Sequence, residues 1–161
     1  MKPNLIKTIT VSLTATMLGL ALSLAAPYET GQAVEPFTTR DQHEKEFVFK
    51  PKETQYLLVS HDMETGKKAN AALNALGKDY LGSKKAVYMA NIFGMPGIGR
   101  MFAMPKMKKY SHRIILADDA ALIAKFPAQP GKVSVLALSG GKVRSVSYWT
   151  PGAEGVETYL K

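Results

Sequence analysis

Apolar residues gather along the chain in short runs that predict the strands of a sheet. Residues 56–59 form an unbroken apolar run, as expected for a strand that is covered on both faces. Residues 133–138 and 143–148 flank Gly140 and Gly141 and predict a β-hairpin. Shorter runs predict further strands at 47–49, 86–92, 113–116 and 121–126.

A helical period follows the run at 56–59. Its apolar positions repeat at the spacing of one helix face and are Ala69, Ala72, Leu73, Leu76 and Tyr80. Asp62 and Glu64 stand where the start of a helix favours acceptors and negative charge, and Gly82 fits its end. Residues 98–110 also favour a helix, but Pro105 is expected to break or kink it. Residues 156–160 predict a short closing helix.

The order strand, helix, strand, helix, strand, hairpin, helix predicts an α/β fold. Parallel strands joined by a helix, followed by a hairpin, give a mixed central sheet flanked by helices. We therefore expect a three-layer domain over residues 46–161 that ends in a β-hairpin and a C-terminal helix. The polar residues 26–45 are expected to form an extended segment that leads into this domain.

The first 25 residues have the pattern of a signal peptide. Lys2 and Lys7 precede a run without charges at 9–24, and Ser23-Leu24-Ala25 offers small residues for cleavage. Gly31-Gln32-Ala33 offers a second cleavage site. The run is shorter than the ~20 residues of a spanning helix, and an uncleaved membrane anchor is the alternative. The sequence thus predicts a periplasmic or secreted protein.

Composition excludes several kinds of chemistry. The 161 residues contain no cysteine, which excludes thiolate nucleophiles, disulfides and cysteine-based metal sites in this chain. The formal net charge is +8, but the positive residues are scattered. We expect a solvated basic surface, with weak contact with an anionic membrane surface left open. No platform of aromatic and basic residues predicts nucleic-acid binding.

Several short phrases carry a resemblance to a known fold. They are residues 28–37 with Asp41-Gln42, Pro96-Gly97-Ile98-Gly99 with Met101-Phe102, and the hairpin around Gly141. Together with the order of elements they resemble the thioredoxin-like fold, and the first phrase is similar to the opening of peroxiredoxins. The chain most closely resembles the small exported family named for enterobacterial YtfJ, which shares Glu29-Thr30-Gly31-Gln32 and the later phrases.

The resemblance implies a reactive thiol where the central strand meets its helix. Ser60-His61-Asp62-Met63-Glu64 occupies that corner here, so thiol-dependent oxidoreductase or peroxidase activity is excluded. The resemblance also implies a cis proline just before the hairpin. The usual spacing points to Val133, and Pro130 lies three residues too early.

The same corner supplies the candidate binding residues Ser60, His61, Asp62 and Glu64, with Lys67 nearby. One interpretation is a helix cap beside a solvent-exposed histidine. The other is a remodelled active-site corner that binds an anion or a partner at the start of the helix. Adjacent residues at a strand end point in different directions, so they do not predict a catalytic triad, and no catalytic residue is predicted.

A cluster of methionines gives the candidate metal ligands, Met101, Met104 and Met107, with Met95 nearby. Thioethers select Cu(I), but methionine also fills irregular cores. The three histidines have no ligand spacing, and Gly94, Gly97 and Gly99 do not match a dinucleotide-binding motif. We expect no cofactor, with Cu(I) or a flavin as alternatives.

These observations predict a non-enzymatic exported protein that binds an envelope protein or a small ligand. Its binding surface would combine residues 60–64, Lys67 and the basic, apolar segment 94–109, which could also lie on a membrane surface. The alternatives are a periplasmic copper or redox accessory protein that uses the methionines, and an oxidoreductase with a bound organic cofactor such as a flavin.

Overall fold

The computed structural model describes residues 26–161, so the predicted signal peptide at 1–25 lies outside the described residues. The elements are β1 (Phe37–Asp41), β2 (Glu46–Phe49), β3 (Tyr56–Ser60), α1 (Met63–Ala75), α2 (Tyr80–Ser83), β4 (Ala86–Asn91), α3 (Gly97–Met107), β5 (Ile115–Ala117), α4 (Ala120–Ile123), β6 (Val133–Ser139), β7 (Lys142–Trp149) and the 3-10 turn η1 (Val156–Thr158). Within this part of the chain, no helix combines the length and apolar character needed to cross a membrane.

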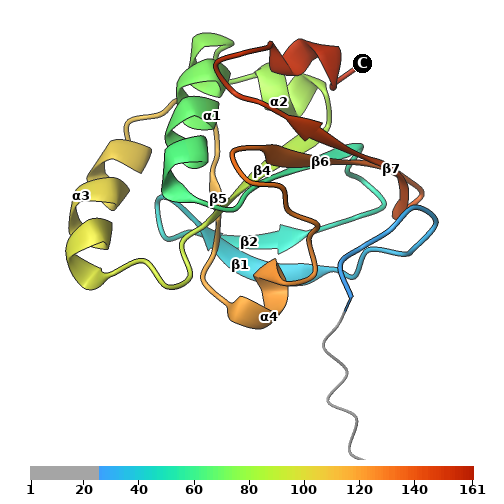
Figure 1. The fold of residues 1–161 in the computed structure, drawn as a ribbon, viewed down its shortest axis with the longest axis horizontal. Coiled ribbons are helices and arrows are strands. Elements are labelled where there is room, and N and C mark those ends of the chain that lie inside the picture. Colours follow the sequence, from blue (N-terminus) through green and yellow to red (C-terminus); the bar gives the residue numbers. More distant parts are fainter. Residues whose placement is uncertain (1–25) are drawn as a thin grey trace, which may run out of the picture.

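The strands form one mixed sheet in the order β2-β1-β5-β4-β3-β6-β7 (Figure 1). The central strands β3, β4 and β5 are parallel, and every other pairing is antiparallel. All five residues of β3 are buried, as its apolar run predicts. The predicted mixed α/β sheet is confirmed.

Helices and loops cover both faces of the sheet and complete three layers. Helices α1, α2 and α3 and the closing turn η1 pack on one face, around Leu58, Tyr88 and Trp149. On the other face, α4 and the segment before β1 pack around Phe49, Leu57 and Phe126. Strand β5 and the residue before it alternate between the two cores, since Ile114 and Leu116 join the first and Ile115 and Ala117 the second.

The extended segment at 26–45 contains a strand that the apolar pattern did not predict. Strand β1 pairs with β2 and β5, and its exposed positions are polar, so it lacks an apolar run. Before β1, the backbone N–H of Gly31 donates to Val143 at 2.7 Å and that of Val34 to Gly141 at 2.9 Å. This segment therefore pairs with the last strand of the hairpin.

The first helix begins as predicted and ends early. Asp62 is its N-cap, but α1 ends at Ala75 with Leu76 as its C-cap. Gly77 has φ +87°, a conformation that interrupts the helix at low cost only for glycine. The predicted end at Gly82 is therefore wrong, and residues 80–83 form the separate helix α2.

Two further expectations about local structure are wrong. Helix α3 continues through Pro105 to Met107. Proline removes one N–H from the last turn only, and the exposed face lets water pair with the freed carbonyl; the N–H of Lys108 still donates to Met104 at 3.0 Å. Residues 121–126 do not form a strand, because the side chain of Asp119 accepts from the N–H of Leu122 at 2.8 Å and starts α4.

The hairpin is confirmed. Its turn residues Gly140 and Gly141 have φ of 58° and 82°, as a two-residue turn that follows the twist of the strands requires. A bulge lies in β7 at Arg144, because Ala137 pairs with Ser145 and the next residue, Leu138, pairs with Val143. The predicted closing helix is the single turn η1.

A buried glutamine joins the end of β1 to the start of β5. The Gln42 Nε2 group donates to the carbonyl of His112 at 2.8 Å, and Gln42 Oε1 accepts from the N–H of Ile114 at 2.9 Å. The backbone N–H of Gln42 donates to Ile114 at 3.0 Å. The side chain thus pairs two buried backbone groups that the strands leave without partners.

We expect Gln42→Met to lower the free energy of unfolding by about 2–4 kcal/mol, because it leaves two buried backbone groups unpaired. Urea unfolding measures the change. The control is Gln129→Met, at an exposed position without a side-chain hydrogen bond in the described chain, with an expected change of less than about 0.5 kcal/mol. Equal losses in the two variants would contradict the role of Gln42.

Candidate functional site

The candidate residues lie at one edge of the sheet. Parallel strands β3, β4 and β5 end there at Ser60, Asn91 and Ala117, and antiparallel β6 begins there. Ligands of α/β proteins commonly bind beyond the carboxyl ends of the parallel strands. Helix α1 starts at this edge, so the predicted corner between strand and helix is present.

Asp62 is fully engaged as the cap of α1. Its Oδ1 accepts from the N–H of Thr65 at 2.8 Å, and its Oδ2 accepts from the hydroxyl of Thr65 at 2.7 Å. Burial alone would raise the pKa of Asp62, but the hydrogen bonds from Thr65 outweigh it and hold that pKa below its ordinary value. The carboxylate stays charged and serves the helix start.

His61 is half-buried, so the expectation of a solvent-exposed histidine is wrong. Its Nε2 lies 3.0 Å from the hydroxyl of Ser134, and that hydroxyl donates to the carbonyl of Pro127. Ser134 has one proton and uses it on Pro127, so His61 Nε2 must be the donor. Burial lowers the pKa of His61, which keeps the ring neutral near pH 7.

Ser60 has no base beside it. Its hydroxyl is buried and shares a hydrogen bond of 2.9 Å with the hydroxyl of Tyr88, whose pKa burial raises strongly. His61 bonds to Ser134 instead. The corner therefore holds no pair of nucleophile and base, although Ser60, His61 and Asp62 are consecutive in the sequence.

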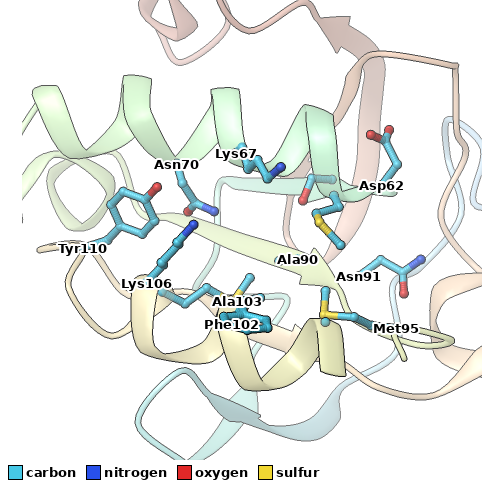
Figure 2. Close-up of a pocket in the computed structure, with 15 residues that line it drawn as sticks. Asp62, Lys67, Asn70, Ala90, Asn91, Met95, Phe102, Ala103, Lys106 and Tyr110 are labelled. Carbon is cyan, nitrogen blue, oxygen red and sulfur yellow. The ribbon is translucent and has the colours of Figure 1, made fainter. Parts of the chain in front are cut away.

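A groove of about 240 Å³ opens between α1 and α3 at this edge (Figure 2). Its apolar lining comes mainly from Met63, Met95, Phe102, Ala103, Met107 and Tyr110. Its polar lining comes from Ser60, Asp62, Lys67, Asn70, Asn91 and Lys106. The volume is slightly below the usual 300–1,000 Å³ of ligand pockets, and the apolar majority is typical of them.

The groove brings together three of the five predicted binding residues, Ser60, Asp62 and Lys67. His61 and Glu64 do not line it. Glu64 and Lys67 form an exposed ion pair at 3.3 Å on the outer surface of α1, a kind that contributes little to stability.

The methionines are divided between the groove and other surroundings. Met107 lines the groove together with Met63 and Met95, whereas Met104 packs against the core and Met101 is 63% exposed outside the groove. The three predicted metal ligands thus have three different surroundings. Among residues 26–161, no three His, Asp or Glu side chains are placed to hold a metal ion.

Arg100 holds α3 in place at the groove. None of the residues Gly97–Met107 is fully buried, so packing alone ties this helix weakly to the domain. The Arg100 guanidinium pairs with the carboxylate of Asp118 at the end of β5 through both terminal nitrogens. It also donates to the carbonyls of Ile92 and Met95 at 3.1 Å and 3.3 Å. One side chain thus joins α3 to the ends of β4 and β5.

Beneath the groove lies a polar pair, His112 and Asn70, that sequence reasoning missed. His112, 1% exposed, stands between the rings of Tyr88 and Tyr110, and its Nε2 lies 3.0 Å from Asn70 Oδ1. An amide oxygen only accepts, so Nε2 carries the proton; within the described residues, Nδ1 has no partner. Burial lowers the pKa of His112 to about 4. Asn70 appeared in the sequence as one of several polar residues on the outer side of a helix.

The hairpin lacks the implied proline geometry. Residues 26–161 contain no cis peptide bond, so Pro130 is trans, and Lys132 directly precedes β6. Near the start of β6, the hydrogen bond between His61 and Ser134 joins the corner to this strand.

Comparisons with known proteins agree on the fold. No family model matches the chain, and no curated protein matches its sequence. The thioredoxin domain of a thiol-disulfide oxidoreductase from Bacteroides vulgatus superposes with a TM-score of 0.52 at 14% identity, covering 83% of this chain and 99% of that one. The fold is thioredoxin-like. A peroxidoxin from Mycobacterium tuberculosis (TM-score 0.53, 12% identity, 78% and 90% coverage) supports this, as does a peroxiredoxin-like protein from Aquifex aeolicus (0.52, 11%, 82% of each chain).

These similarities establish the thioredoxin-like fold and nothing finer, because the identities are low. The resemblance to the family named for YtfJ is not confirmed by them. The three matched proteins are named for thiol or peroxide chemistry, whereas this thioredoxin-like chain has no cysteine.

The buried neutral state of His112 makes stability depend on pH. Its folded pKa of about 4 lies below its ordinary 6.5, so its contribution to stability is complete above pH 6.5 and is lost as the pH falls towards 4. At about 1.4 kcal/mol per pH unit, the loss amounts to about 3 kcal/mol.

We expect His112→Gln to flatten the dependence of the unfolding free energy on pH between 6.5 and 4, measured by urea unfolding at several pH values. Carboxylates that titrate in this range affect both proteins alike, so the difference between the curves reports His112. His43→Gln, at an exposed position, is the control and should keep the slope of the original protein. If His112→Gln keeps the slope of the original protein, the pH dependence of the unfolding free energy does not come from His112.

Proposed function

We propose that this chain is an exported, non-enzymatic thioredoxin-like protein that binds a partner or small ligand in the groove between α1 and α3. The observation that carries the proposal is the position of that groove. It opens beside Ser60 and Asp62, at the corner where proteins of this fold with redox activity hold their reactive thiol. The chain thus has the thioredoxin-like fold and a groove at this corner, but it has no thiol there.

The chemistry of the corner supports binding over catalysis. The Ser60 hydroxyl bonds to Tyr88, the Asp62 carboxylate to Thr65, and the His61 ring to Ser134. Each of these three groups is therefore already engaged with a neighbour in the protein. The apolar lining, in contrast, faces open space and gains from being covered.

The proposal of export depends on the signal-peptide pattern of residues 1–25. The contacts of the residues that follow favour one of the two predicted cleavage sites. Tyr28 packs on Phe126 with ring centroids 5.6 Å apart, and its N–H donates to Lys125 at 2.8 Å. Gly31 donates to Val143 in β7. Cleavage after Ala33 would remove these contacts, whereas cleavage after Ala25 keeps them all.

We therefore expect the exported protein to begin at Ala26, which N-terminal sequencing or intact mass spectrometry of protein recovered from the cell envelope will show. Because residues 31–33 pair with the hairpin and Tyr28 packs on Phe126, a shortened chain that starts at Val34 should also unfold at a lower temperature. A mature chain that begins at Val34 would show this cleavage prediction to be wrong, and an uncleaved chain in the membrane fraction would favour the anchor.

The groove itself is tested with a neutral apolar probe, 1-octanol. We expect saturable changes in the backbone amide NMR shifts of α1 and α3, because covering apolar surface is favourable. Ala103→Trp fills the groove and should abolish these changes. Ala121→Trp introduces the same ring at an exposed position in α4 and should leave them intact.

A dispersed amide spectrum in both variants establishes that they are folded. Shift changes that do not saturate, or that persist in Ala103→Trp, would rule out the groove as the binding site.

The alternatives of a Cu(I) site or a bound flavin stay predictions of the sequence. For copper, Met107 lines the groove but Met101 and Met104 do not. A copper site there would have to use Met63, Met95 and Met107 instead, which come from α1, the loop before α3 and the end of α3.

A further inference from the structure

The charged side chains that line the groove differ in how well protein partners satisfy them. Asp62, Lys67 and Lys106 line it, and both oxygens of Asp62 accept hydrogen bonds from Thr65. Lys106 takes part in none of the ion pairs of the described residues. Lys67 pairs only with the exposed Glu64, an interaction that water screens strongly. The two lysines therefore give the groove a net positive rim.

The two lysines stand on opposite walls. Lys67 comes from α1 and Lys106 from α3, and both line the groove. Figure 2 shows the Lys106 side chain directed towards α1, whereas the Lys67 side chain lies along α1, where its ammonium group pairs with Glu64. Residues 97–109 contain no Asp or Glu, so the wall formed by α3 brings no negative charge. An anionic group in the groove would be attracted by both ammonium groups.

Asn70 adds a neutral donor that is already oriented. The residue is 3% exposed and lines the groove, and its Oδ1 is held by His112 Nε2. Its Nδ2 group donates to no acceptor in the described part of the chain, and it faces the groove in Figure 2. This amide donor reaches solvent and has no acceptor within the described residues, so it is free to donate to a ligand that brings an acceptor.

We propose that the groove binds a small amphipathic anion, with its acidic group between Lys67, Lys106 and Asn70 and its apolar tail along Met95, Phe102 and Met107. The proposal rests on the function proposed above and names the ligand class. The groove is small, at about 240 Å³, and open to solvent, so it suits a ligand with a single short apolar tail. We therefore test it with eight-carbon probes.

The test compares three eight-carbon probes on the purified protein by NMR titration: octanoate, 1-octanol and octylammonium. They share one tail, so differences in dissociation constant report the head group. We expect octanoate to bind most tightly and octylammonium most weakly, with a separation of at least about tenfold, because two ammonium groups attract the first and repel the second.

The variant is Lys67→Gln/Lys106→Gln, and the matched control is Lys108→Gln/Lys109→Gln. Both remove two positive charges, but Lys108 and Lys109 are exposed and do not line the groove. The first should weaken octanoate binding about tenfold, at about threefold per lysine, and leave 1-octanol unchanged. The second should change octanoate binding by less than about twofold.

The outcomes separate the ligand class from the proposed function. If all three probes bind with the same affinity, or octylammonium binds most tightly, the groove binds ligands but the anionic class is wrong. Equal weakening in the two double variants would also overturn the class, because the effect would then come from net charge. If none of the probes binds, the proposed function fails as well.

Discussion

Burial of β3 on both faces of the sheet is the constraint on which the rest of the structure depends. All five of its residues are buried, and both its edges are paired, with β4 on one side and β6 on the other. Such a strand cannot shift register without exposing apolar residues. Its end at Ser60 is therefore fixed, and so is the start of α1. Because Ser60 is buried there, its hydroxyl must find a partner inside the protein, which is Tyr88.

Sequence reasoning identified this strand, the corner after it and the hairpin because each depends on local signals: an apolar run, a cap residue and two glycines. It missed β1, because the exposed positions of this strand are polar. It also expected α3 to break or kink at Pro105, but the helix continues there, where exposure to water lowers the cost of the missing backbone donor. It also missed Asn70 as a site residue. The partner of Asn70 is His112, 42 residues away, and periodicity does not show which polar residue of a helix will meet a buried partner.

The missing thiol changes what the corner can do. In a thioredoxin-like fold, the start of a helix favours negative charge, which suits a thiolate. Here the carboxylate of Asp62 supplies that charge permanently and is held by Thr65. The helix start is therefore already occupied. The ligand binding proposed above therefore relies on side chains further along the walls, on α1 and on α3, whose attachment to the sheet depends on Arg100 and Asp118.

His112 couples the stability of the domain to the groove. Its neutral ring donates to Asn70 Oδ1 and thereby turns the Asn70 amide donor towards the groove, while its bare Nδ1 remains buried without a partner among the described residues. A buried polar atom without a partner costs free energy, so a ring with one engaged nitrogen is poorly explained by core packing alone. The cost is easier to understand if the pair orients a donor for a ligand. In the binding proposed above, the polar pair under the groove orients a donor for the ligand, and the lysines at the rim supply the positive charge.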